Sequence, residues 1–191
     1  MKSLRLSVCA LALVLSGCST LSSINWSAAN PWNWFGSSTT VSEKGVGGIT
    51  ANTALHEKVV NEALGGDYHL RSGMKTDKGN IIRYFEALKD DKVALVINGE
   101  KGTVSQVDVL DSTIETAKGI KIGTAFSELY DKAFGQCVAA SGDDDKAVEC
   151  KAPESQHISF IFTGAWSGPE GLMPSDDALK SWKLHKIIWR R

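Results

Sequence analysis

Alternating hydrophobic and polar positions predict β-strands in the second half of the chain. Ile158, Phe160 and Phe162 alternate with polar residues from His157 to Thr163, which is typical of a strand with one buried face. Further runs with strand character are separated by short polar or glycine-containing turns, so we expect antiparallel meanders with local connections. These runs cover residues 67–71, 81–88, 93–97, 103–110, 148–151 and 182–189, with one more strand near Cys137.

Two short segments with helical periodicity precede these strands. In the second, Phe126, Leu129, Tyr130, Ala133 and Phe134 are spaced as one apolar helix face, and we expect that face to cover a sheet. The first segment has a poorer stripe. The expected N-cap residues are Thr53 and Thr124. The apolar stripe of the first segment consists of Leu55, Val59, Ala63 and Leu64.

The two helical segments also belong to an internal repeat. Residues 48–57 align with residues 119–128, with identical Gly, Ile, Thr, Ala and Glu at matching positions. The sequence therefore predicts an α+β, β-rich fold of two pseudo-repeats, each a short helix followed by antiparallel strands. We expect one β-rich domain over 41–191, with repeats of about 41–112 and 113–191, packed as a sandwich or a strongly curved sheet.

The N-terminus has the pattern of a lipoprotein signal peptide. Lys2 and Arg5 precede an uncharged apolar run, and Leu15-Ser16-Gly17 leads directly into Cys18. We expect cleavage after residue 17 and acylation of Cys18 with diacylglycerol and palmitate, which would anchor the chain stably because more than one acyl chain is present. The alternative is an ordinary cysteine at the end of an uncleaved apolar segment. Ser19, in place of Asp, favours export to the outer membrane, on its periplasmic face.

Residues 18–40 form the expected tether between the lipid and the domain. They are rich in Ser, Asn and Trp and almost uncharged, and Asn30-Pro31 disfavours a continuous helix. The segment holds four aromatic residues that could lie at the membrane interface, where amphipathic rings are favourable. A plain tether and docking on the domain or a partner are the alternatives. The aromatic residues are Trp26, Trp32, Trp34 and Phe35.

The charge balance and the cysteine content indicate which partners and which covalent bonds to expect. Two of the 21 basic residues and none of the 22 acidic ones lie before Cys18, so 19 basic and 22 acidic residues remain, a balance that argues against a nucleic-acid partner. Cys9 lies in the signal segment and Cys18 is the lipid site. Cys137 and Cys150 then form an even pair, which we interpret as a disulfide in an oxidising compartment. A metal or redox pair is the alternative, although no CxxC spacing is present.

Motifs that carry catalytic or metal chemistry are not identifiable in the sequence. The four histidines are scattered without metal-ligand spacing, and no Ser, His and Asp set or phosphate-binding glycine motif is recognisable. The run Asp143-Asp144-Asp145 lacks the alternating ligands of a calcium loop and is better explained as a solvated hairpin tip. We therefore expect no catalytic residue, metal or cofactor.

Several longer segments resemble one family of bacterial envelope proteins. The chain is similar to the RpoE-regulated lipoprotein family of enteric bacteria along essentially its whole length. This resemblance implies an envelope lipoprotein under the envelope-stress sigma factor, with Cys18 as the lipid attachment site and no assigned biochemical activity. The segments that carry the resemblance are residues 25–36, 71–76, 168–177 and 186–191.

Three functional hypotheses follow from these patterns. The leading one is a non-enzymatic outer-membrane lipoprotein of the cell envelope whose domain binds a partner, such as another envelope protein. The alternative is a protein that binds a small apolar ligand or lipid in a groove between the two repeats. The third is an envelope hydrolase, for which Glu57, Glu128 and Glu170 are too dispersed in the sequence to nominate an acid–base pair.

Overall fold

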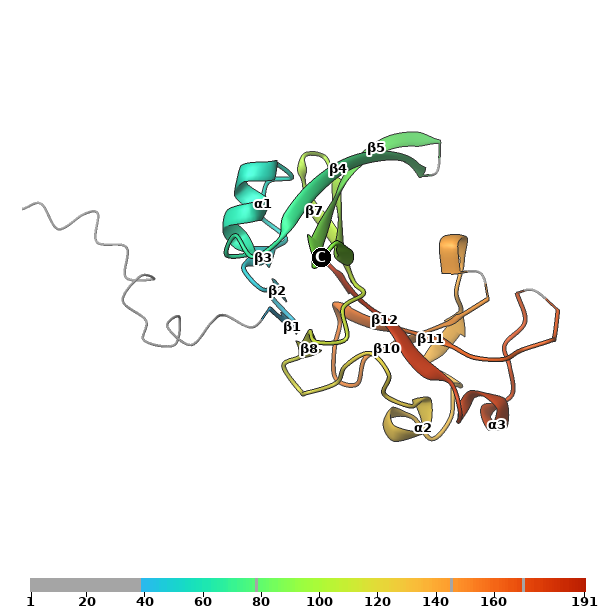
Figure 1. Ribbon diagram of the computed structural model, residues 1–191. Helices are drawn as coiled ribbons and strands as arrows, with labels where there is room; N and C mark the ends of the chain where they lie inside the picture. The colour runs from blue at the N-terminus through green and yellow to red at the C-terminus, as the bar shows by residue number, and fades with distance from the viewer. Residues whose placement is uncertain (1–38, 78, 145, 170) are drawn as a thin grey trace, which may run out of the picture. The chain divides into compact units, whose positions relative to one another are not determined.

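The protein is built from two β-sheets and a few short helices (Figure 1). The computed structural model describes residues 39–191 apart from residues 78, 145 and 170. The smaller sheet has the strand order β3-β2-β1-β8, and the larger has the order β4-β5-β6-β7-β12-β11-β10-β9. This arrangement confirms the predicted β-rich, sandwich-like α+β fold.

The elements are short except in the large sheet. The small sheet contains β1 (Thr40–Ser42), β2 (Gly45–Val46), β3 (Ile49–Thr50) and β8 (Glu115–Thr116). The first half of the large sheet contains β4 (His69–Asp77), β5 (Asn80–Lys89), β6 (Lys92–Glu100) and β7 (Thr103–Val109). Its second half contains β9 (Cys137–Ala139), β10 (Val148–Lys151), β11 (Ile158–Thr163) and β12 (Lys183–Arg190). The helical elements are α1 (Glu57–Ala63), α2 (Phe126–Leu129), the 3-10 turn η3 (Gly142–Asp144) and α3 (Asp176–Leu179).

The strand order of the large sheet reveals the two repeats. After α1 the chain runs through β4 to β7 as a meander of adjacent strands, and after α2 it runs through β9 to β12 in the same way. The last strands of the two meanders, β7 and β12, pair antiparallel with Asp108 opposite Ile188 and Gln106 opposite Arg190. The predicted pseudo-repeats are thus joined side by side into one sheet.

One face of the large sheet supplies most of the hydrophobic core. Val107 and Val109 of β7 and Ile187 and Trp189 of β12 are at most 1% exposed, and their side chains share one face because residues two apart in a strand point the same way. In β11, Phe160 and Phe162 are fully buried as the alternation predicted. The small sheet packs into the same core through buried Val41, Val46 and Ile49.

Helix α2 is shorter than its apolar stripe predicts. It ends at Leu129, Tyr130 takes up an extended conformation with φ −139° and ψ 133°, and Phe134 is 86% exposed. The Tyr130 ring instead packs with its centroid 5.2 Å from that of Phe126, and its hydroxyl donates a hydrogen bond to the carbonyl of Lys151. These contacts hold Tyr130 in its extended conformation, so the prediction of one apolar face through Phe134 is wrong.

The predicted N-caps are also displaced along the chain. The residues that precede α1 and α2 are His56 and Ala125 rather than Thr53 and Thr124. The hydroxyl of Thr53 accepts a hydrogen bond from the backbone N–H of Thr50, within the turn that follows β3. Among the described residues, no helix is long and apolar enough to cross a bilayer.

The predicted disulfide is present at one edge of the large sheet. Cys137 of β9 lies directly opposite Cys150 of β10, and their sulfur atoms are bonded. Cys150 is fully buried in the core. The crosslink closes a loop with a sequence separation of 13 residues and so ties the short edge strand β9 to its neighbour.

We predict that reduction of this disulfide destabilises the protein by roughly 3 kcal/mol, because the crosslink lowers the entropy of the unfolded chain. Urea unfolding of the purified protein with and without a reductant, followed by tryptophan fluorescence, measures the change. A variant with Cys137→Ser and Cys150→Ser together is the control and should not respond to the reductant. Equal midpoints for the oxidised and reduced protein would contradict the prediction.

Candidate functional site: a polar groove at the seam of the two repeats

The face of the large sheet opposite the core carries a groove of about 740 Å³, a volume in the usual range of ligand-binding pockets. Along β7 and β12, residues that line the groove alternate with residues whose side chains enter the core. The groove therefore lies at the seam where the two meanders meet. Most of its lining is polar, and the side chains that matter below are Lys75, Asn98, Asp108, Glu149, Lys186 and Arg190.

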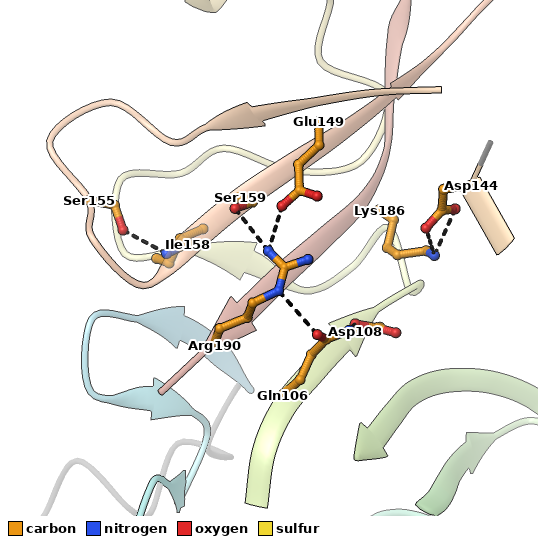
Figure 2. Close-up of polar contacts among 9 residues, drawn as sticks. All are labelled: Gln106, Asp108, Asp144, Glu149, Ser155, Ile158, Ser159, Lys186 and Arg190. Carbon is orange, nitrogen blue, oxygen red and sulfur yellow. Dashed lines mark hydrogen bonds and ion pairs between the residues drawn. The ribbon is translucent and has the colours of Figure 1, made fainter. Parts of the chain in front are cut away.

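Arg190 connects three other strands across the groove (Figure 2). Its Nη1 donates to Glu149 of β10 and, at 3.2 Å, to the hydroxyl of Ser159 of β11, while its Nε donates to Oε1 of Gln106 of β7 at 3.1 Å. Because the planar guanidinium is held at several points, its orientation is fixed. The ion pair with Glu149 compensates the charge of Arg190.

Lys186 and Asp144 form a second ion pair at the groove wall. The Lys186 ammonium donates to both carboxylate oxygens of Asp144, at 2.7 and 2.9 Å (Figure 2). The side chains are only 12% and 21% exposed, so loss of either partner would leave a poorly solvated charge. The pair fixes the 3-10 turn η3 against β12.

The ionisation of the groove carboxyl Asp108 is perturbed by its burial. Burial raises its pKa above the ordinary value. The hydrogen bond from Gln106, whose Nε2 lies 2.6 Å from Oδ1 of Asp108, and the positive charges of Lys186, Lys75 and Arg190 oppose that rise without cancelling it. Asp108 therefore takes up a proton more readily than an exposed aspartate.

Asn98 is the least satisfied polar side chain of the groove. It lies on β6, opposite Gln106 of β7 and Tyr84 of β5, and is 5% exposed. Within the described residues, neither its amide oxygen nor its amide nitrogen has a hydrogen-bond partner. Leaving a buried polar group unpaired costs roughly 1–3 kcal/mol, so this position lowers the stability of the fold.

The outer half of the β4–β5 hairpin overhangs the groove. Strand β5 pairs with β6 only from Tyr84 onward, so the preceding residues of β5 pair with β4 alone, and Figure 1 shows the hairpin arching past its neighbours. Lys75 and Ile82 contribute to the groove from this part. The Tyr84 ring lies across Gly73, where a Cβ atom would come within 2.4 Å of it, so a glycine lets the ring lie flat on β4.

Of the residues singled out in the sequence, Asp144 lines this groove, where its ion pair with Lys186 leaves its side chain 21% exposed, so the expectation of a solvated tip is wrong for it. The other residues singled out lie elsewhere. Cys137 and Cys150 lie together at the β9 edge. Glu57 and Glu128 are exposed on α1 and α2, and the side chain of residue 170 is outside the described part. Cys18 and the aromatic residues Trp26, Trp32, Trp34 and Phe35 also lie outside the described residues.

Sequence reasoning missed the groove residues, although a signal for some of them was present. Gln106 and Asp108 occupy the polar positions of a predicted strand, and Lys186 occupies one in the last strand. What could not be read from the sequence was that these two strands are neighbours. In the described part of the chain, no group of three or more His, Cys, Asp or Glu is placed to hold a metal ion.

We predict that Asp108→Asn raises the stability of the protein at pH 7. The folded-state pKa of Asp108 lies above the unfolded one, so its protonation stabilises the fold fully below pH 3.8 and this contribution is lost as the pH rises through the folded value. Asparagine does not titrate and still accepts the Gln106 hydrogen bond. The difference in urea midpoint between the variant and the unsubstituted protein should shrink as the pH falls toward 3.

Exposed Asp67 offers a matched control, because Asp67→Asn removes a carboxyl that lies outside the groove. Its stability should follow the same pH profile as the unsubstituted protein. A gap between Asp108→Asn and the unsubstituted protein that stayed constant from pH 7 to pH 3 would show that Asp108 is not perturbed by burial.

Comparison with known proteins places the chain in a family. Residues 23–191 match the family described as "Protein of unknown function (DUF1131)". The chain is 67% identical, over 191 residues and 100% of both chains, to the "Uncharacterized protein YfeY" of Escherichia coli strain K12. It is also similar to the crystal structure of the uncharacterized protein yfeY from Escherichia coli, with a TM-score of 0.73 and 61% identity over 80% of this chain and 100% of that chain. The chain therefore belongs to the DUF1131 family.

Proposed function

We propose that the protein is a stress-regulated lipoprotein of the bacterial outer membrane, facing the periplasm, whose domain binds a ligand or partner without catalysing a reaction. The observation that carries the binding role is the polar groove at the seam of the two repeats. It is concave, it is built by strands from both halves of a rigid sheet, and its polar groups converge on one space. Concave shape and converging polar groups that can fix the orientation of a ligand are features of ligand pockets.

The mutual pairing of the charged groups in the groove supports a binding role over a catalytic one. Glu149 is held by Arg190 and Asp144 by Lys186, and Gln106 donates to Asp108. Side chains that fix one another in this way form a preorganised surface, which lowers the cost of binding. The polar lining favours a polar ligand over the apolar one considered as the alternative.

A hydrolase is the second candidate, and one observation favours it. The raised pKa of Asp108 is a property that general acids of envelope-polymer hydrolases also show. A second, ionised carboxylate would be required, and Glu149 and Asp144 are both engaged by cations. If the protein releases products from a purified envelope polymer and Asp108→Asn abolishes the release, the hydrolase replaces the binding role.

The anchoring part of the proposal rests on the N-terminal sequence. The run from Leu15 to Cys18, with Ser19 after it, supports acylation and outer-membrane sorting. The expected aromatic contacts of Trp26, Trp32 and Trp34 with the membrane interface would add to the attachment. The resemblance of the chain to lipoproteins of the envelope-stress regulon supports its expression under that stress.

We predict that Cys18→Ser abolishes incorporation of labelled palmitate and moves the protein out of the membrane fraction, because the acyl chains supply the attachment. Fractionation of cells grown with labelled palmitate measures both effects. Cys9→Ser is the matched control, since it makes the same change within the signal segment and should leave labelling and fractionation unchanged. Ser19→Asp should keep the label but shift the protein to the inner membrane. A labelled, membrane-bound Cys18→Ser protein would refute the anchoring.

A further inference from the structure

Strand β4 has an unpaired outer edge. It is an end strand of the large sheet and pairs with β5 along its full length of nine residues. Beyond this ladder, no backbone hydrogen bond joins β4 to another described residue. In an antiparallel strand, every second residue directs its N–H and C=O groups toward the same side, so the outer side of β4 carries a row of donors and acceptors. Another extended polypeptide can satisfy that row, whereas a lipid or a sugar lacks the matching repeat.

The outer part of the β4–β5 hairpin, which arches past its neighbours (Figure 1), also lacks a third strand. Residues 74–77 of β4 pair with residues 80–83 of β5, and β6 pairs with β5 only from Tyr84 onward. We call residues 74–83 the hairpin arm. A two-stranded ribbon is marginally stable in water, and a third strand with an apolar face stabilises it. A strand added along β4 would give the arm this support.

One face of the hairpin arm carries exposed apolar side chains. Met74 is 74% exposed and Ile81 is 76% exposed. Met74 lies directly opposite Arg83, so these two side chains share a face of the sheet. Along β5 the same face carries Ile81 and the buried Phe85, because residues two apart in a strand point the same way. The apolar face that packs into the core at Phe85 therefore continues onto the arm, where it is exposed.

The hairpin arm is basic, although the chain as a whole is not. Its sequence holds three basic residues and one acidic residue, whereas the formal net charge of the chain is −1 at pH 7. Among the described residues, Lys75 and Arg83 have no ion-pair partner. The Lys75 ammonium lies over the Tyr84 ring, 5.9 Å from its centre, on the opposite face of β4 from Met74. A neighbouring strand would therefore meet a cation on one face and an apolar side chain on the other, which favours a partner with alternating acidic and apolar residues.

We propose that β4 is a docking edge for an acidic segment of another protein, which adds to the large sheet as a further strand. Acidic side chains of that segment face Lys75, and its apolar side chains lie beside Met74. The backbone hydrogen bonds supply affinity, and the alternating side chains supply specificity. This inference goes beyond the proposed function, because it needs neither a ligand in the groove nor a particular attachment to the membrane.

The test uses the purified full-length protein in micelles of an uncharged detergent. The probe is a fluorescently labelled peptide of about nine residues, matched to the length of β4, in which glutamate and valine alternate. One comparison peptide has lysine in place of each glutamate, and a second has every backbone nitrogen of the acidic peptide methylated. We expect the acidic peptide to bind and to slow hydrogen exchange of the backbone amides in residues 69–77, as measured by mass spectrometry.

Each comparison peptide should bind at least about tenfold more weakly than the acidic one. The lysine peptide reverses every charge contact, and the methylated peptide has lost all the N–H groups that would donate to β4.

Two charge variants test the direction of the preference. Lys75→Glu should weaken binding of the acidic peptide about fivefold and strengthen binding of the lysine peptide, because it replaces an exposed attraction by a repulsion. Lys183→Glu makes the same change at an exposed position of β12, outside the arm, and should bind both peptides like the unsubstituted protein. A role of Lys75 in stability alone would weaken binding of both peptides instead of shifting the preference between them.

Three results would overturn the inference. They are unchanged hydrogen exchange in residues 69–77 at every concentration of the acidic peptide, equal affinity for the acidic and the lysine peptide, and equal affinity for the acidic peptide and its methylated form. Slower exchange in β4 with vesicles of anionic phosphatidylglycerol, but not with the peptide, would also overturn it and assign the arm to a lipid surface. The peptide comparisons use the unsubstituted protein, so they hold even if Lys75→Glu does not fold.

Discussion

The pairing of β7 with β12 is the constraint on which the rest of the molecule depends. It joins two meanders that lie far apart in the sequence, and its register decides which residues enter the core. With Val107 opposite Trp189 and Gln106 opposite Arg190, the apolar set faces the core and the polar set faces the groove. A slip of one residue would exchange the two faces. The register of β7 with β12 therefore determines both which residues form the core and which line the groove.

The same seam combines stabilising and destabilising features. On the core side, Ile187 and Trp189 are buried and contribute hydrophobic free energy in proportion to the apolar area removed from water. On the groove side, a poorly solvated carboxyl at Asp108 and an unpaired amide at Asn98 oppose folding. The fold remains stable because the free energy gained from its core and its disulfide exceeds these unfavourable contributions. Local losses of this kind concentrate at sites that serve a ligand.

The parts of the fold that depend on local patterns were predictable from sequence. Strand alternation, the helix-and-strand repeat and the Cys137–Cys150 pairing all rest on residues close in sequence or on an even cysteine count, and the structure confirms them. Long-range pairings were not accessible. The small sheet brings Val41 opposite Thr116 through the parallel pairing of β1 with β8, and no local pattern encodes that contact.

The groove could not be predicted from the sequence for the same reason, and one of its residues also lies in a segment with the pattern of a turn. The predicted strand ends at residue 97, which places Asn98 in the following turn, as Asn and Gly favour, whereas β6 continues to Glu100 with an irregularity between Asn98 and Gly99. For helix α2, by contrast, the sequence predicted an element longer than the one observed. Its spacing favoured a longer helix, but the tertiary contacts of Tyr130 outweighed a weak local preference.

The order of the strands also determines where the sheet can meet another chain. Its two edges are β4 and β9, and unpaired strand edges are the positions at which sheets recruit foreign strands. Strand β9 is three residues long and is tied to β10 by the cystine, so it offers little template for growth. Strand β4 is nine residues long. Its Arg71 is paired with Glu86 of β5, and its Lys75 carries a charge of the kind that discourages edge-to-edge association. For contacts between copies of this protein, β4 is therefore the edge of the large sheet that offers the longer template, and the charge of Lys75 opposes its use.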